Sequence, residues 1–170
     1  MDNVAEAVIS VHHRDQPKIL LVEDNYANRD MLMRRLQRQG FEVCFAVNGP
    51  SGVAMAADER PDVILMDVAL GDMDGWEATK LIKAKPATAH IPIIALTAHA
   101  LATDRDMSIA VGCADFDTKP VDLSRLVGKI RACLTRSKVE GRCSETASIL
   151  SNLLQRDRFA SKKENRGASC

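Results

Sequence analysis

Acidic side chains follow two apolar runs of the sequence directly. Residues 19–22 lead into Glu23 and Asp24, and residues 63–66 lead into Asp67. Three carboxylates brought together repel one another unless a hard cation neutralises them. Mg²⁺ prefers oxygen ligands and keeps several waters, so one or two protein carboxylates beside a phosphate oxygen are enough to hold it. The residue types therefore predict a magnesium-dependent reaction of a phosphate group.

A hydroxyl and an amine complete the set of reactive groups. Thr97 ends another apolar run, and Lys119 stands next to Pro120 shortly after a further one. During phosphoryl transfer the negative charge spreads over the phosphoryl oxygens, and a hydroxyl donor and a cation both stabilise that charge. We expect these two side chains to act on the same phosphate as the acids.

The elements that must position these groups alternate between strand and helix. Five short apolar runs predict strands, at residues 19–22, 41–47, 63–66, 91–96 and 114–116. Helices are predicted between them, including one closed by Gly40, one over 75–85 and one over 101–111. A complete apolar stripe over 123–134, with Asp122 as its N-cap, predicts the last helix.

This alternation indicates an α/β fold with a doubly wound, five-stranded parallel sheet and helices on both faces. In such a sheet the carboxyl ends of the strands line one edge, where ligands bind. The acids, the threonine and the lysine are therefore predicted to meet there.

Composition limits the other possibilities. The chain has 170 residues, 46% of them hydrophobic, and carries 23 basic and 23 acidic side chains. This length suits one ordinary domain, and the zero net charge gives no electrostatic reason to expect nucleic acid or membrane binding. The acidic N-terminus and the lack of a long apolar run predict a cytoplasmic protein. Five cysteines without a C-x-x-C pair predict reduced thiols.

Four sequence segments carry a resemblance to a known family. They are "ILLVEDN", "MDVALGDMDG", "IPIIALTA" and "GCADFDTKPVD", and the reactive residues within them are separated by 43, 30 and 22 positions. Over about residues 17–136 the chain resembles the receiver domain of bacterial two-component response regulators, most of all receivers that are attached to hybrid histidine kinases or stand alone. The resemblance implies a flavodoxin-like (βα)5 fold.

The resemblance also implies a role for each reactive residue. Asp67 would accept a phosphoryl group from a phosphohistidine on a histidine kinase or a histidine phosphotransfer protein. Asp24, Asp67 and the backbone carbonyl of Ala69 would hold Mg²⁺, with Glu23 acting through water. Thr97 and Lys119 would contact the phosphoryl oxygens.

Three further residues take their roles from the resemblance. The Lys119–Pro120 bond is expected to be cis, and the small Ala98 would leave room for the phosphoryl group and offer its N–H. Phe116 matches the position of the aromatic residue that turns inward after phosphorylation. On the sequence alone an ordinary core phenylalanine fits equally well.

The chain also departs from the family pattern. Gly71 stands where a proline is common, which we expect to loosen the loop that carries the Ala69 carbonyl and to affect Mg²⁺ affinity. Ala69 and His99 occupy positions that tune hydrolysis of the acyl phosphate. Because an alanine cannot orient a water with its side chain, slow to moderate self-dephosphorylation is predicted. Asp72 and Asp74 are interpreted as turn residues, with Asp74 capping the next helix.

The segments outside the receiver carry less information. Residues 1–16 are predicted to form a flexible arm and residues 137–170 a tail with a net charge of +3, either disordered or containing one short helix through Ile149, Leu150, Leu153 and Leu154. The tail is too short for a usual DNA-binding output domain.

These features together predict a single-domain response regulator that signals to a downstream protein through protein contacts. Its only catalysis would be its own phosphorylation and slow dephosphorylation. Two alternatives remain open: a receiver cut from a hybrid histidine kinase, and a magnesium-dependent phosphatase of the haloacid dehalogenase type. The phosphatase needs a second acid two residues after the nucleophile, where Ala69 stands. A DNA-binding regulator would need a second helix in the tail.

Overall fold

A single parallel sheet forms the centre of the molecule. The computed structural model describes residues 16–98, 102–137 and 139. Its strands lie in the order β2-β1-β3-β4-β5, and every neighbouring pair is parallel. Their bounds are β1 Lys18–Val22, β2 Glu42–Ala46, β3 Val63–Asp67, β4 Ile93–Thr97 and β5 Asp115–Thr118. The order reverses between β1 and β3, so the predicted doubly wound sheet is confirmed.

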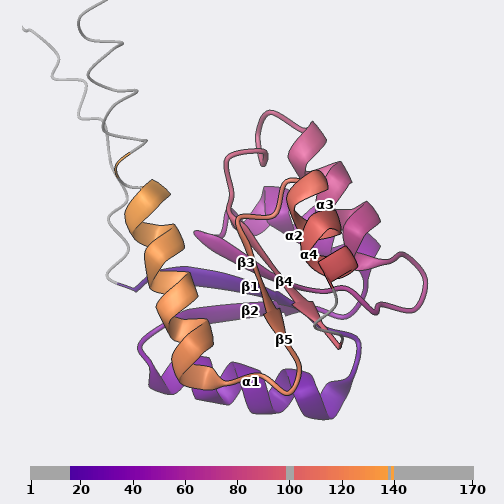
Figure 1. The fold of residues 1–170 in the computed structure, drawn as a ribbon. Helices are drawn as coiled ribbons and strands as arrows, with labels where there is room; N and C mark the ends of the chain where they lie inside the picture. Colours follow the sequence, from indigo (N-terminus) through magenta and orange to yellow (C-terminus); the bar gives the residue numbers. More distant parts are fainter. Residues whose placement is uncertain (1–15, 99–101, 138, 140–170) are drawn as a thin grey trace, which may run out of the picture.

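Helices cover both faces of the sheet (Figure 1). They are α1 Tyr26–Arg38, α2 Gly49–Glu59, α3 Gly75–Ala84, α4 Ala102–Ala110 and a C-terminal helix over residues 123–137. The first helix and the C-terminal helix pack on one face, whereas α2 and α3 pack on the other. Neighbouring residues of β1 alternate between the two cores: Leu21 faces α1, and Leu20 faces α2 and α3. Continuous apolar strands are expected when both faces of a sheet are covered.

The fifth strand begins and ends later than its prediction. The sequence predicted residues 114–116, but the strand runs over Asp115–Thr118. Two acids within four residues resemble a loop when only the sequence is considered. Asp117 is nevertheless buried, and its carboxylate is paired with Arg125 of the C-terminal helix at 2.6 Å, so a charged residue is accommodated within the strand.

Several predictions concern residues outside the described part of the chain. They are the arm up to residue 15, the tail from residue 140 with its Ile149, Leu150, Leu153 and Leu154 stripe, His99, and two of the five cysteines. Cys44, Cys113 and Cys133 are free thiols. Among the described residues, no helix is both long and apolar enough to cross a membrane.

Gly75, the first residue of α3, packs against the end of β3. A Cβ atom built on Gly75 would lie 2.2 Å from the backbone oxygen of Asp67 and 2.8 Å from the Cα of Val68. Neither backbone atom can move without shifting the strand end that carries Asp67. Asp74, as predicted, caps this helix: its carboxylate accepts a hydrogen bond from the Glu77 amide at 2.7 Å.

We therefore predict that Gly75→Ala lowers the free energy of unfolding by about 1–3 kcal/mol, the usual range for an overpacked site. Chemical denaturation measures this change. Gly71→Ala is the matched control, because a Cβ at Gly71 meets nothing within 4 Å, and its effect should stay within about 0.5 kcal/mol. Equal effects of the two substitutions would contradict the close packing of α3 on β3.

Candidate functional site

The predicted acids meet at the carboxyl edge of the sheet. Glu23 and Asp24 follow β1, and Asp67 is the last residue of β3. Val22 pairs with Met66 in the strand register, so Glu23 and Asp67, the residues that directly follow this pair, lie side by side. One carboxylate oxygen from each of the three acids lies within 4.8 Å of the others. Glu23 and Asp67 are buried, with exposed fractions of 2% and 3%, whereas Asp24 is exposed to solvent.

Lys119 joins the two buried acids. Its Nζ donates hydrogen bonds to Glu23 Oε2 at 2.8 Å and to Asp67 Oδ2 at 2.7 Å. Burial opposes the charge on the lysine, but the hydrogen bonds to Asp67 and Glu23 outweigh it, and the pKa of Lys119 is raised above its usual value. The amine therefore stays charged at neutral pH. The Lys119–Pro120 peptide bond is cis, as the resemblance implied.

Backbone and side-chain donors fix the remaining acid oxygens. The Ala69 amide donates to Asp67 Oδ1 at 3.0 Å, which places residue 69 beside the cluster. The Asn28 side-chain amide donates to Glu23 Oε1 at 3.3 Å. Asn25 caps α1 directly after the two acids by accepting a hydrogen bond from the Asn28 amide at 3.1 Å. The start of α1 thus holds the loop that carries Glu23 and Asp24.

This donor set fits Mg²⁺. The cluster offers only oxygen ligands, from two or three carboxylates, and Asp24 leaves one side open to water. A hard divalent cation at this position would offset the repulsion between the carboxylates, which Lys119 alone reduces by one charge. The roles of the Ala69 carbonyl and of a water on Glu23 stay predictions.

Thr97 reaches the same edge, and its hydroxyl contacts α4. It donates a hydrogen bond to Asp104 Oδ2 of α4 at 2.7 Å. The Thr97 carbonyl accepts a hydrogen bond from the Lys119 amide at 2.7 Å, which ties the ends of β4 and β5 together. Asp104 was not predicted as a site residue. Its only sequence signal is its place on α4, seven residues after Thr97.

A cavity of about 550 Å³ opens beside the acids. Site residues Glu23, Ala98, Lys119 and Pro120 form one end of it, and the rest of its lining comes largely from α1, with Met31, Leu32 and Arg35 among the lining residues. Of the three acids, only Glu23 lines this cavity. Ala98 is among the residues that line this cavity, and its role toward a phosphoryl group stays a prediction.

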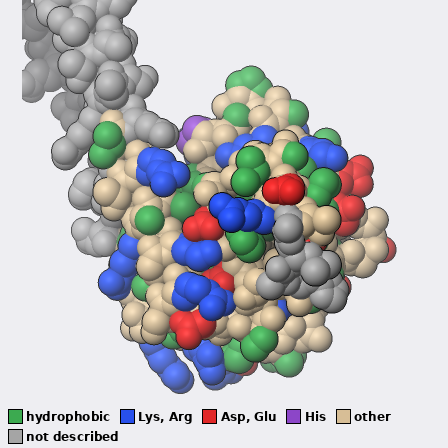
Figure 2. All heavy atoms as spheres, in the orientation of Figure 1, with side chains coloured by type: hydrophobic (Ala, Val, Ile, Leu, Met, Phe, Trp, Pro, Cys, Tyr) green, Lys and Arg blue, Asp and Glu red, His purple; other side chains and the backbone are tan. Residues whose placement is uncertain are grey.

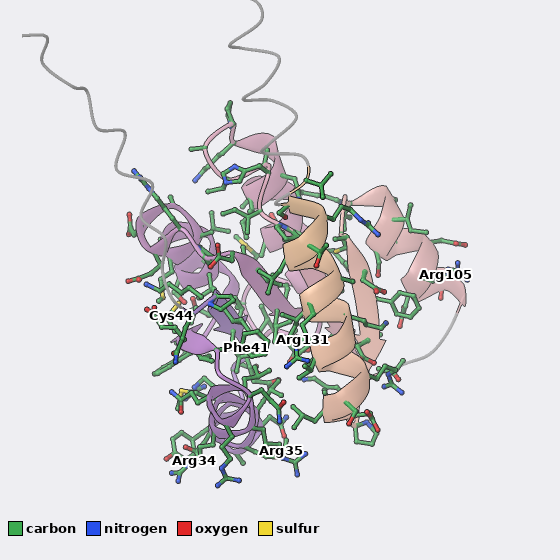
Figure 3. The ribbon with its side chains drawn as sticks, turned by 90° about the vertical axis from the view of Figure 1, so that its left-hand side faces the viewer. Arg34, Arg35, Phe41, Cys44, Arg105 and Arg131 are labelled. Carbon is green, nitrogen blue, oxygen red and sulfur yellow. The ribbon has the colours of Figure 1, made fainter. Side chains whose placement is uncertain are left out.

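Phe116 lies on β5, apart from the acid cluster. The side chain is half-buried, and Lys129 Nζ lies 5.2 Å from its ring centroid. It lines a second cavity of about 210 Å³ together with residues of α4, among them Arg105, Ser108 and Ile109. Figure 3 shows Arg105 on the outer side of α4. The switch role of Phe116 stays a prediction.

The face formed by β5 and the C-terminal helix carries paired charges. Arg125 bonds to Asp117 at 2.6 Å and Lys129 to Asp115 at 3.1 Å. Figure 2 shows basic and acidic side chains side by side on this face. Because these partners belong to different elements, a movement of β5 would alter the charge pattern of the surface.

The fold and the site together define a class of protein: an α/β domain with an acid cluster, a threonine and a lysine at the switch point of a parallel sheet. Comparison with known proteins gives the same result. Residues 19–131 match the family described as response regulator receiver domain. The chain therefore belongs to the response regulator receiver family.

The similar proteins have different overall lengths. The chain is 37% identical over 117 residues to protein PilH of Pseudomonas aeruginosa, a match that covers 69% of this chain and 97% of PilH. It is 40% identical over 122 residues to the response regulator PleD of Caulobacter vibrioides, covering 72% of this chain but only 27% of PleD. The chain thus spans about a quarter of PleD.

A solved structure is similar at the level of both fold and sequence. It is the receiver domain of the sensor histidine kinase PA1611 of Pseudomonas aeruginosa, with a magnesium ion coordinated in its active-site cleft. The two chains share 36% identity with a TM-score of 0.66, and the match covers 71% of this chain and 98% of that domain.

The hydrogen bond between Thr97 and Asp104 leads to a prediction about α4. Asp104→Ala should lower the local stability of α4 by about 1 kcal/mol, the typical net value of one hydrogen bond. Amide hydrogen exchange over residues 102–110 measures it as a roughly fivefold loss of protection. Asp106→Ala is the matched control, because Asp106 is an exposed acid of the same helix. Unchanged protection in Asp104→Ala would show that the bond does not hold α4.

Proposed function

We propose that this protein accepts a phosphoryl group on Asp67 from a phosphohistidine of a histidine kinase or a histidine phosphotransfer protein, and signals to a downstream protein through its altered surface. The observation that carries the proposal is the Lys119 ammonium bonded to both Glu23 and Asp67, in a cluster that includes Asp24. Such a site can bind a dianionic phosphoryl group only with further positive charge, which a bound Mg²⁺ would supply.

The proposed transfer assigns a task to each residue. A carboxylate oxygen of Asp67 attacks the phosphorus, a new P–O bond forms, and the P–N bond to the donor imidazole breaks in line with it. Lys119 stabilises the charge on the equatorial oxygens. Asp24, Asp67, the Ala69 carbonyl and, through water, Glu23 would hold the metal. Ala98 would offer its N–H to the phosphoryl group.

The signal would then pass through Thr97. Its hydroxyl donates to Asp104 in this structure, and a phosphoryl oxygen on Asp67 would compete for the same hydrogen. Turning Thr97 toward the phosphate would weaken its hold on α4 and let Phe116 move toward the cavity beside it. The surface of α4, β5 and the C-terminal helix would change as a result, and a downstream protein would bind one of its two states.

Catalysis by the protein would be limited to its own phosphorylation and a slow to moderate dephosphorylation. The side chain of Ala69 has no polar atom with which to place a water near the acyl phosphate, and Gly71 gives the preceding loop backbone freedom. Open space around Gly71 agrees with a loose loop.

We place the reaction in the cytoplasm, where histidine kinases expose their phosphohistidines, with no direct role for nucleic acid or membrane.

The similarity to PilH, of which the match covers 97%, supports a role as a single-domain regulator. The similarity to the receiver of a sensor histidine kinase supports the alternative, a receiver that works as part of a hybrid kinase. Both roles use the same phosphorylated aspartate. A phosphatase of the haloacid dehalogenase type is not favoured, because Ala69 stands where its second acid is required.

The first test is Mg²⁺-dependent labelling of Asp67. Incubation with acetyl phosphate or a phosphorylated histidine kinase should label the wild-type protein only when Mg²⁺ is present, because the acids otherwise repel another anion. Asp67→Asn should abolish the label, since an amide cannot form an acyl phosphate. Acid electrophoresis with a radioactive donor measures both.

The matched control is Asp72→Asn, which neutralises an exposed acid in the same loop. It should be labelled like the wild type. Stoichiometric labelling of Asp67→Asn, or full labelling of the wild type in excess chelator, would overturn the proposal.

A further inference from the structure

Arg29 clasps the backbone that carries the two acids after β1. Its Nη1 donates hydrogen bonds to the carbonyl oxygen of Glu23 at 2.9 Å and to that of Asp24 at 3.3 Å. Arg29 lies one turn into α1, and no sequence feature singled it out. Both bonds start from the same nitrogen, whose two hydrogens can reach two neighbouring carbonyls at once.

Two aromatic rings hold the guanidinium in place. The Cζ atom of Arg29 lies 5.6 Å from the ring centroid of Tyr26 and 5.0 Å from that of Phe45. Both rings are unusually accessible for their size, with exposed fractions of 71% for Tyr26 and 44% for Phe45. Exposed aromatic side chains contribute little to the core. The contact with Arg29 therefore explains the positions of these two rings.

These contacts connect the surface of α1 and β2 to the acid cluster. β2 is one of the two edge strands of the sheet and lies beside α1 in Figure 1. The chain from Phe45 to Arg29 to the Asp24 carbonyl therefore links this edge to the exposed acid of the cluster. Within the part of the chain that the structure describes, the Asp24 carboxylate accepts no hydrogen bond and forms no ion pair, unlike those of Glu23 and Asp67. The orientation of the Asp24 carboxylate therefore depends on how firmly its backbone is held.

We propose that Arg29 is a positioning residue: by fixing the Glu23 and Asp24 carbonyls, it orients the acid pair for Mg²⁺ and sets the metal affinity. The inference rests on the proposed magnesium site. It goes further by assigning a function to a cation that touches neither the metal nor the phosphate.

The charge of Arg29 opposes this role, which makes the two contributions separable. As a cation near the cluster, Arg29 repels Mg²⁺, so removal of its charge alone would tighten metal binding. Through its two hydrogen bonds, Arg29 lowers the entropic cost of ordering the loop that carries Asp24, so removal of these bonds would weaken metal binding. The direction of the change in affinity therefore shows which contribution is larger.

The experiment is titration of the full chain with Mg²⁺ by isothermal calorimetry, for wild type and variants. Arg29→Ala and Arg29→Gln should weaken Mg²⁺ binding about three- to tenfold, at or below the lower end of the range for groups that orient metal ligands. Arg29→Lys keeps the charge that repels Mg²⁺ but loses the Nη1 donor that reaches both carbonyls, so it should weaken binding at least as much. Phe45→Leu removes one stacking ring and should act in the same direction, but less.

A second readout needs no metal. In Arg29→Ala without Mg²⁺, amide hydrogen exchange of residues 23–28 should be faster than in the wild type, because the clasp orders the loop before the ion binds. Arg34→Ala is the matched control for both readouts: Arg34 belongs to the same helix, pairs with Asp30 at 2.9 Å and points away from the sheet (Figure 3). Its affinity and exchange should stay at wild-type values.

Unchanged or tighter Mg²⁺ binding in Arg29→Ala and Arg29→Gln would overturn the positioning role and leave the charge effect alone. That result would not affect the proposed phosphoacceptor. By contrast, a wild-type chain that binds no Mg²⁺ would overturn both the magnesium site and the role of Arg29. The Asp24→Asn variant tests the magnesium site separately from the role of Arg29. This variant should lose most of its affinity for Mg²⁺ while Arg29 remains in place.

Discussion

The structure depends on two buried carboxylates that share one lysine. Glu23 and Asp67 lie side by side at the ends of adjacent parallel strands and both bond to Lys119. Burying two like charges is costly unless they are paired, and one ammonium leaves the three acids of the cluster with a net negative charge. The remaining negative charge is what makes a divalent cation, and then a phosphoryl group, a favourable occupant.

Much of the surrounding fold keeps these charges in register. The parallel pairing of β1 with β3 places the two acids together, and the pairing of β4 with β5 brings Thr97 to the same edge as Lys119. The close contact of Gly75 with the Asp67 backbone fixes the end of β3. On the other side, the start of α1 fixes the acid pair through Asn28 and Arg29.

The sequence predicted the residues of the site better than their contacts. Apolar runs that end in Asp24, Asp67 and Thr97 are visible without a structure, because buried parallel strands are continuous and their carboxyl ends share an edge. The fifth strand was placed too early, because its acids look like loop residues until Arg125 is seen to neutralise one of them. The contacts of Asp104 and Arg29 could not be predicted, since they depend on side-chain directions that no spacing rule specifies.

The most direct test of the proposed mechanism is to locate the phosphorylated atom itself. After phosphorylation with Mg²⁺, borohydride reduction converts an aspartyl phosphate to homoserine, and mass spectrometry of the proteolysed chain identifies the altered residue. The proposed mechanism predicts one modified position, Asp67, in the wild-type protein, and no modification of Glu23, the other buried acid bonded to Lys119. Homoserine at another acid, or a phosphate that resists reduction and maps to a hydroxyl or histidine side chain, would contradict the proposed role of the acid cluster.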